Sequence, residues 1–128
     1  GHVRFHGLGP PAEIPGLIGA VAVLVHASLR EGLARTLPQA LIAGVPVVSY
    51  DVDGAREVVT TGVTGELVPP RDVAALSAAL NRLVGDEELR RRYGSAGRKF
   101  VETFRHENMT RQIRALYERV LRERGQAP

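Results

Sequence analysis

Two short runs made almost entirely of apolar residues set the strongest limit on how this chain can fold. They are "AVLVH" (22–26) and "PVVSY" (46–50), and a helical pattern, "RTLPQALIAG" (35–44), lies between them. Strands that are apolar throughout are covered on both faces, which is typical of parallel sheets. Parallel neighbours also need a crossover connection, and a helix usually supplies it. The pattern therefore predicts an α/β fold with a parallel sheet and flanking helices.

The rest of the chain continues this alternation and then becomes helical. Further strands are expected over 3–6 and 65–70, and short helices over 12–20 and 54–62. The helical part, 72–125, should hold a helix over 72–84 with Asp72 as its N-cap, two helices within 86–104 broken near Gly94–Gly97, and a long amphipathic helix over 106–125. The arginine-rich stretch 90–94 is expected to face solvent. We expect one domain over 1–128, with the helical part packed on the sheet.

Composition excludes several classes of protein. The chain has 128 residues and no cysteine, so it cannot rely on disulfides or thiolate chemistry. No apolar run reaches the roughly 18 residues of a membrane span, and the N-terminal residues lack the pattern of a signal peptide. These features favour a cytoplasmic protein. Basic residues number 17 and acidic residues 14, and the two kinds are interspersed, so we expect no nucleic-acid partner.

Three polar or glycine-bearing loops leave the carboxyl ends of the expected strands, where parallel sheets bind ligands. They are "GLGPP" (7–11), "ASLREGLART" (27–36) and "DVDGARE" (51–57). The second and third lead into helix N-termini, whose free N–H groups and partial positive charge suit a phosphate.

The stretch "SLREGLARTLPQ" (28–39) allows two interpretations. Thr36 and Gln39 have the spacing of a capping box, and Pro38 fits the first turn of a helix, so Gln39 could simply cap that helix. Glu31 comes too early to cap it, and it is either a ligand-binding carboxylate or an ordinary surface glutamate. His26 is expected to be a packed or hydrogen-bonded histidine rather than a metal ligand.

An ordered set of motifs over about 55 residues resembles the C-terminal half of family 4 retaining glycosyltransferases, which have the GT-B fold. The matching residues are Ser28, Glu31, Gly32 and Leu33; Ala43, Gly44, Pro46, Val47 and Val48; Gly54 and Glu57; and Thr64, Gly65, Leu67, Val68 and Pro69. This resemblance implies a Rossmann-like sheet that is an incomplete half of a GT-B fold. It implies binding of a nucleoside-diphosphate sugar and retaining transfer of a hexosyl group, without a cofactor or a metal ion.

The resemblance also implies partners outside this chain. A carbohydrate or lipid acceptor would be bound by an N-terminal half, and the cationic pair that grips the diphosphate would lie in an earlier segment. We therefore expect the isolated chain to be inactive. The full-length protein could be membrane-associated.

Residue by residue, the resemblance places Glu31 near hydroxyls of the transferred sugar, as the catalytic residue. Its other expected donor-binding residues are Ser28, Gly32, Leu33, Thr36, Leu37 and Gln39, with Gly7 and Leu8 near the base. The family has glutamate where this chain has Gln39, so we expect weaker binding of the ribose. An alternative, favoured by Gln39, is a non-catalytic binding or assembly module with the same fold.

The expected sheet has an open edge. In the Rossmann strand order 3-2-1-4-5-6, residues 3–6 would be strand 3 and residues 22–26 strand 4, with two absent strands between them. An exposed strand edge tends to pair with another chain. We expect residues 3–6 to pair beside 22–26 instead, or the chain to associate with itself.

Overall fold

Three parallel strands form the centre of the computed structural model, which describes residues 2–104 and 106–125. They are β1 (Leu24–His26), β2 (Val47–Tyr50) and β3 (Gly65–Val68), in the order β1-β2-β3. The register pairs Leu24 with Val47 and Val47 with Gly65. The predicted parallel sheet and the order of its last three strands are confirmed.

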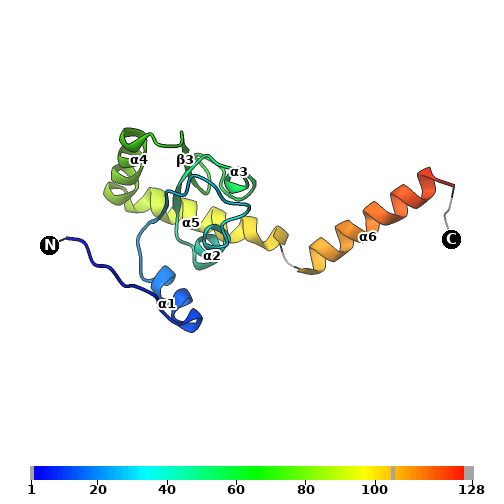
Figure 1. Ribbon diagram of the computed structural model, residues 1–128, viewed down its shortest axis with the longest axis horizontal. Helices are drawn as coiled ribbons and strands as arrows, with labels where there is room; N and C mark the ends of the chain where they lie inside the picture. Colours follow the sequence, from blue (N-terminus) through cyan, green and yellow to red (C-terminus); the bar gives the residue numbers. More distant parts are fainter. Residues whose placement is uncertain (1, 105, 126–128) are drawn as a thin grey trace.

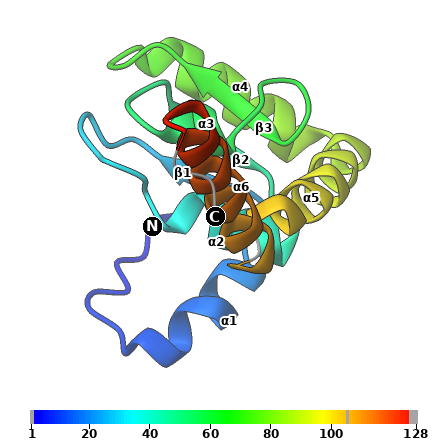
Figure 2. The same ribbon diagram turned by 90° about the vertical axis from the view of Figure 1, so that its right-hand side faces the viewer.

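Helices surround the sheet on both sides (Figures 1 and 2). The helices of the described residues are, in chain order, η1 (Pro11–Glu13), α1 (Ile14–Gly19), α2 (Thr36–Ala43), α3 (Ala55–Val58), α4 (Val73–Gly85), α5 (Glu87–Val101), η2 (Glu102–Phe104) and α6 (His106–Glu123), of which α6 lies away from the sheet. Asp72 caps α4 as predicted, because its carboxylate accepts the N–H of Ala75 at 2.8 Å. The helix expected over 54–62 is a single turn, α3.

Alternate residues of β2 face two separate parts of the core. Val47 packs with Leu41 and other residues of α1, α2 and α3, whereas Val48 and Tyr50 pack with Leu83 of α4 and with α5. Val47 and Val48 are completely buried. The central strand is therefore covered on both faces, which is the reason its sequence is almost continuously apolar.

The break predicted near Gly94–Gly97 is wrong, because α5 runs through both glycines without interruption. A Cβ atom on Gly94 would collide with the carbonyl oxygen of Gly44, and one on Gly97 would lie 2.9 Å from Leu41 Cδ2. These glycines let α5 approach α2 closely. Gly44, with φ of 75°, ends α2 in the left-handed conformation, as expected for a helix C-terminus.

The prediction that 90–94 faces solvent fails at Tyr93, which is only 2% exposed. Its hydroxyl donates to Glu66 Oε1 at 2.6 Å, and Glu66 also pairs with Arg82. Burial, together with the hydrogen bond to Glu66, raises the pKa of Tyr93 above its ordinary value. This network joins α4, α5 and β3, which a helix periodicity alone does not reveal.

Residues 3–6 form no strand, so that prediction is also wrong. Val3 and Phe5 are 73% and 96% exposed, and β1 pairs only with β2 within the described part of the chain. The N-terminal stretch runs outside the sheet instead (Figure 1). A strand this short gains nothing without a neighbour to bond to. The expected pairing beside 22–26 does not occur.

The helical part divides into packed and unpacked helices. Both α4 and α5 pack on the sheet or on α2, whereas α6 projects away from them (Figure 1) and buries none of its described residues. The amphipathic pattern of α6 is confirmed, but its apolar face is exposed and does not join the core. This face carries Met109, Ile113, Leu116, Tyr117 and Leu121.

Between residues 2 and 125, leaving aside 105, no helix is long and apolar enough to cross a membrane.

Self-association stays a prediction, and the open β1 edge supports it. An unpaired edge strand offers free N–H and C=O groups to a second chain. Sedimentation of the 13.8 kDa chain should give a mass that rises with concentration. A monomer at all concentrations would contradict the expectation.

Substitution of Gly94 by alanine should lower the free energy of unfolding by about 1–3 kcal/mol, as overpacking does. The added methyl group meets backbone rather than a side chain that can move. The matched control is Gly85→Ala, also in a helix, where the added Cβ meets nothing within 4 Å among the described residues outside its own stretch of helix. The control should be neutral or stabilising by up to about 1 kcal/mol. If urea denaturation gives Gly94→Ala the same free energy of unfolding as the wild type, close packing at Gly94 is disproved.

Substitution of Tyr93 by phenylalanine should lower the free energy of unfolding by about 1.5–3 kcal/mol near neutral pH, since a hydrogen bond to a charged group is lost. Because the pKa of Tyr93 is raised on folding, the unfolded chain loses this proton first. Its stabilising contribution is complete below about pH 10 and declines as pH rises further.

The alkaline decline should therefore be shallower in Tyr93→Phe than in the wild type. Tyr117→Phe is the control, because Tyr117 is 67% exposed on α6. In thermal unfolding, Tyr117→Phe should match the wild type both near neutral pH and above about pH 10. If the stability of Tyr93→Phe falls with rising alkaline pH as steeply as that of the wild type, the raised pKa of Tyr93 is not the cause of the decline.

Candidate functional site

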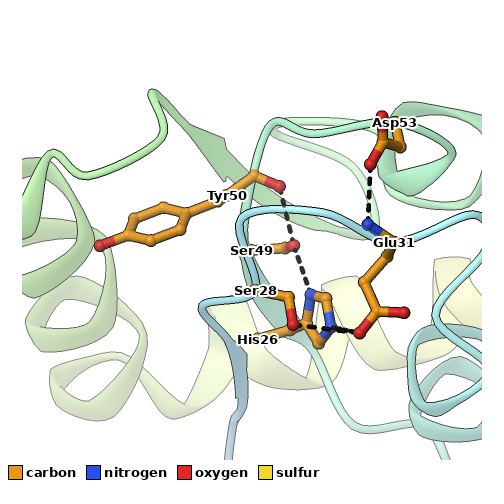
Figure 3. A network of polar contacts seen from close by, with 6 residues as sticks. All are labelled: His26, Ser28, Glu31, Ser49, Tyr50 and Asp53. Atoms are coloured by element: carbon orange, nitrogen blue, oxygen red, sulfur yellow. Dashed lines mark hydrogen bonds and ion pairs between the residues drawn. The ribbon is translucent and has the colours of Figure 1, made fainter.

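The loops that follow β1 and β2 meet at the carboxyl edge of the sheet. Two hydrogen bonds from backbone N–H groups join them: Glu31 N–H donates to the side-chain oxygen Asp53 Oδ2 at 2.7 Å, and Gly54 N–H donates to Gly32 O at 3.0 Å. Figure 3 shows Glu31 and Asp53 facing each other from the two loops. Adjacent parallel strands end side by side, so residues 22 positions apart are brought together.

The carboxylate of Glu31 is fixed by neighbours on its own side of the site. Ser28 Oγ donates to Glu31 Oε1 at 3.0 Å, and His26 Nε2 lies 3.8 Å from the same oxygen. The Glu31 side chain remains 41% exposed. A carboxylate that is oriented yet exposed can still accept hydrogen bonds from a ligand.

His26 connects this carboxylate to the interior of the sheet. Its Nδ1 lies 3.3 Å from Ser49 Oγ, and Ser49 in turn donates to the carbonyl of Tyr50 at 2.9 Å (Figure 3). Because the hydroxyl proton of Ser49 points to that carbonyl, its oxygen accepts from His26 Nδ1–H. The prediction of a hydrogen-bonded histidine is confirmed.

Two contacts were not predicted from the sequence: that of Ser49 with His26 and that of Asp53 with the N–H of Glu31. Ser49 is completely buried in an apolar strand, and a buried hydroxyl needs a hydrogen-bond partner. A serine within an apolar strand could therefore have indicated a hydrogen-bond partner on a neighbouring strand. Asp53 offered no comparable signal, because its partner lies on another loop.

The loop and the start of α2 present unpaired donors. Within the described residues, the backbone N–H groups of Gly32, Leu33 and Thr36 have no hydrogen-bond partner. The N–H of Leu37 donates to Ala34 O at 3.0 Å, and the Leu37 side chain is buried. An anion that approaches this loop and the start of α2 would therefore meet unpaired amides such as these rather than the amide of Leu37.

The capping box predicted for Thr36 and Gln39 does not form. The N-cap residue is Arg35, no side chain bonds to the cap, and Thr36 is already helical. A helical Thr36 cannot turn its hydroxyl back to the amide at position 39, whose N–H bonds to Arg35 O instead. Gln39 is exposed and lines a hollow of about 350 Å³ between α1 and α2, with Pro15 among its neighbours. Its side chain is thus not committed to capping.

The structure brings only part of the predicted set together. An open hollow of about 610 Å³ is lined by Arg30, Glu31, Gly32 and Asp53, whereas Gln39 lies in the separate hollow described above. Gly7 and Leu8 precede α1, and no hydrogen bond or ion pair in the described part of the chain joins them to Glu31. In that same part, no three His, Cys, Asp or Glu side chains are grouped to hold a metal ion.

Solved structures share this architecture. The C-terminal domain of a group 1 glycosyl transferase from Francisella tularensis superimposes with a TM-score of 0.70 at 24% identity, over 77% of this chain and 51% of that one. The likeness to it concerns the fold alone. The Anabaena protein HepE, solved in complex with UDP-glucose, has a TM-score of 0.73 at 29% identity, over 86% of this chain and 31% of its own.

Sequence comparisons agree with this likeness. A phosphatidyl-myo-inositol mannosyltransferase from Mycobacterium leprae is 35% identical over 120 residues, which cover 93% of this chain and 32% of the relative. The chain thus spans about a third of the length of such relatives. The family model described as "Glycosyl transferases group 1" matches residues 1–100. The chain therefore belongs to the group 1 glycosyl transferases, and its fold is that of their C-terminal GT-B domain.

Proposed function

We propose that residues 1–128 are the donor-binding part of a longer retaining glycosyltransferase that uses a nucleoside-diphosphate sugar. The observation that carries this proposal is the position of Glu31, an oriented carboxylate beside unpaired amides at the carboxyl edge of a parallel sheet. Such an edge is where open α/β sheets bind nucleotides. The Anabaena relative solved with UDP-glucose supports the same ligand class.

Each group has a chemical task in this proposal. Glu31 accepts hydrogen bonds from hydroxyls of the transferred hexosyl group, and Ser28 holds that carboxylate in place. The amides of Gly32, Leu33 and Thr36 donate to the sugar and the diphosphate, helped by the positive end of α2. Positions 7 and 8 contact the base.

Gln39 is proposed to bind the ribose hydroxyls. An amide can accept from one hydroxyl and donate to another, but it lacks the charge of a carboxylate. Hydrogen bonds to charged groups contribute about 1.5–3 kcal/mol, against about 1 kcal/mol for neutral ones. Ribose binding is therefore weaker than a glutamate at this position would give. The exposed, uncapped side chain of Gln39 supports its availability to a ligand.

The remainder of the enzyme is proposed to lie outside this chain. The relatives are about three times as long, which leaves room for a second half that binds a carbohydrate or lipid acceptor. Without that half the chain binds donor but transfers nothing. The reaction needs no metal ion, and the protein works in the cytoplasm or at its membrane surface.

A non-catalytic binding or assembly module is the second candidate, and Gln39 is the observation that favours it. The family's glutamate would hold the ribose with its charge. A donor site that is no longer used could lose that charge, as it is lost at Gln39. The substitution Gln39→Glu separates the two candidates.

Addition of UDP-, GDP- or ADP-sugars to the full-length protein should raise its unfolding temperature, because a ligand that binds only the folded state stabilises it by about 2.7 kcal/mol at a hundredfold excess over Kd.

Gln39→Glu should tighten binding of the preferred donor by about fivefold to tenfold, the effect of one charge-assisted bond. Glu31→Gln should abolish most transfer while donor still binds. Calorimetric titration and a transfer assay measure these effects.

Gln112→Glu is the matched control, since Gln112 is exposed on α6, away from the site. It should leave donor affinity unchanged. If no common sugar nucleotide stabilises the protein, the proposed function fails. If donor binds but Gln39→Glu has no more effect than the control, the non-catalytic module is favoured.

A further inference from the structure

Asp53 has a backbone conformation that side-chain packing does not explain. Its φ is +43°, in the left-handed region that few residues adopt, although glycine, asparagine and aspartate do so more readily than others. Its side chain is exposed, so burial does not hold it there. Residues kept in such conformations are held by their surroundings and gather at functional sites. The surroundings of Asp53 are the loop that carries Glu31.

Two consecutive residues of the β2 loop bind two consecutive residues of the β1 loop. Asp53 Oδ2 accepts the N–H of Glu31 at 2.7 Å, the short distance typical of a charge-assisted bond (Figure 3). Gly54 N–H then donates to Gly32 O at 3.0 Å. A Cβ on Gly54 would lie 2.6 Å from that oxygen, so only glycine allows the approach. We call this pair of contacts the two-loop clamp.

We propose that Asp53 is a positioning residue for sugar transfer, which fixes the backbone of Glu31 so that its carboxylate faces the donor. The proposal rests on the function proposed above for Glu31. Ser28 and His26 contact the carboxylate end of Glu31, and Asp53 holds the backbone end. The two ends are thus fixed independently. Precise placement matters, because a displacement of about 1 Å can cost roughly 100-fold in rate.

The clamp also determines where an anion can bind. Since Asp53 occupies the N–H of Glu31, that amide cannot donate to a phosphate. The diphosphate is left to the unpaired amides of Gly32, Leu33 and Thr36.

The test compares four variants in the full-length enzyme, two of them at position 53. Asp53→Asn keeps an acceptor oxygen and tolerates positive φ, whereas Asp53→Gly tolerates the same φ but has no acceptor. Asp51→Asn is the control, because Asp51 is on the same loop but pairs with Arg56 at 3.0 Å. Both substitutions at 53 suit the backbone, so unfolding temperatures should stay close to that of the wild type.

The kcat of Asp53→Gly should fall by about 10- to 100-fold, while KM for the donor changes by less than about threefold. Asp53→Asn should restore kcat to within about threefold of the wild type, since a neutral acceptor replaces a charged one. Asp51→Asn should behave as the wild type. Gly54→Ala, which opens the other half of the clamp, should lower kcat even though Asp53 is present.

Hydrogen exchange measured by mass spectrometry on the segment 28–35 follows the clamp without any turnover. Exchange should be faster in Asp53→Gly than in the wild type, and unchanged in Asp53→Asn and Asp51→Asn. This readout distinguishes loss of the loop contact from loss of a direct contact to substrate.

Wild-type kcat in Asp53→Gly would overturn the proposal. So would a kcat for Asp53→Asn as low as that of Asp53→Gly, because the charge would then act on the substrate itself. If the wild type transfers no sugar, the proposed function fails, and unchanged exchange of 28–35 in Asp53→Gly separately overturns the clamp.

Discussion

The parallel pairing of β1 with β2 is the interaction on which the rest of the site depends. Its register places His26 beside Ser49 and ends both strands at one edge. The His26–Ser49 contact and the meeting of the two loops follow directly from that register. A shift of one residue would turn His26 to the opposite face of the sheet.

Close contact between helices supports this sheet from one side. Because Gly94 and Gly97 carry no side chain, α5 lies against the end of α2, and Arg98 donates to Ala43 O at 2.8 Å there. The end of α2 is thereby fixed, and α2 begins at the loop that carries Glu31. The same α5 reaches β3 through Tyr93 and Glu66. Packing far from the site thus helps to hold the start of α2 and the loop before it in place.

Several features could be predicted from local sequence, and others could not. The apolar runs of β1 and β2, the cap at Asp72 and the stop at Gly44 each depend on neighbouring residues, and all were predicted. The strand at 3–6 failed because a strand needs a partner, and none lies beside it. The break at Gly94–Gly97 failed because glycine serves close packing as well as flexibility. The capping box failed because the helix begins one residue too early for it.

The sequence by itself determined the alternation of strand and helix, the family, and Glu31 as the candidate carboxylate. Periodicity, caps and ordered motifs are properties of nearby residues, so they can be read along the chain. Only the tertiary structure decided which distant residues join Ser28 in holding Glu31. Its bond to Asp53 spans 22 residues and the bond between His26 and Ser49 spans 23. Contacts between such distant segments exist only after the sheet has aligned the loops, and no local pattern specifies them.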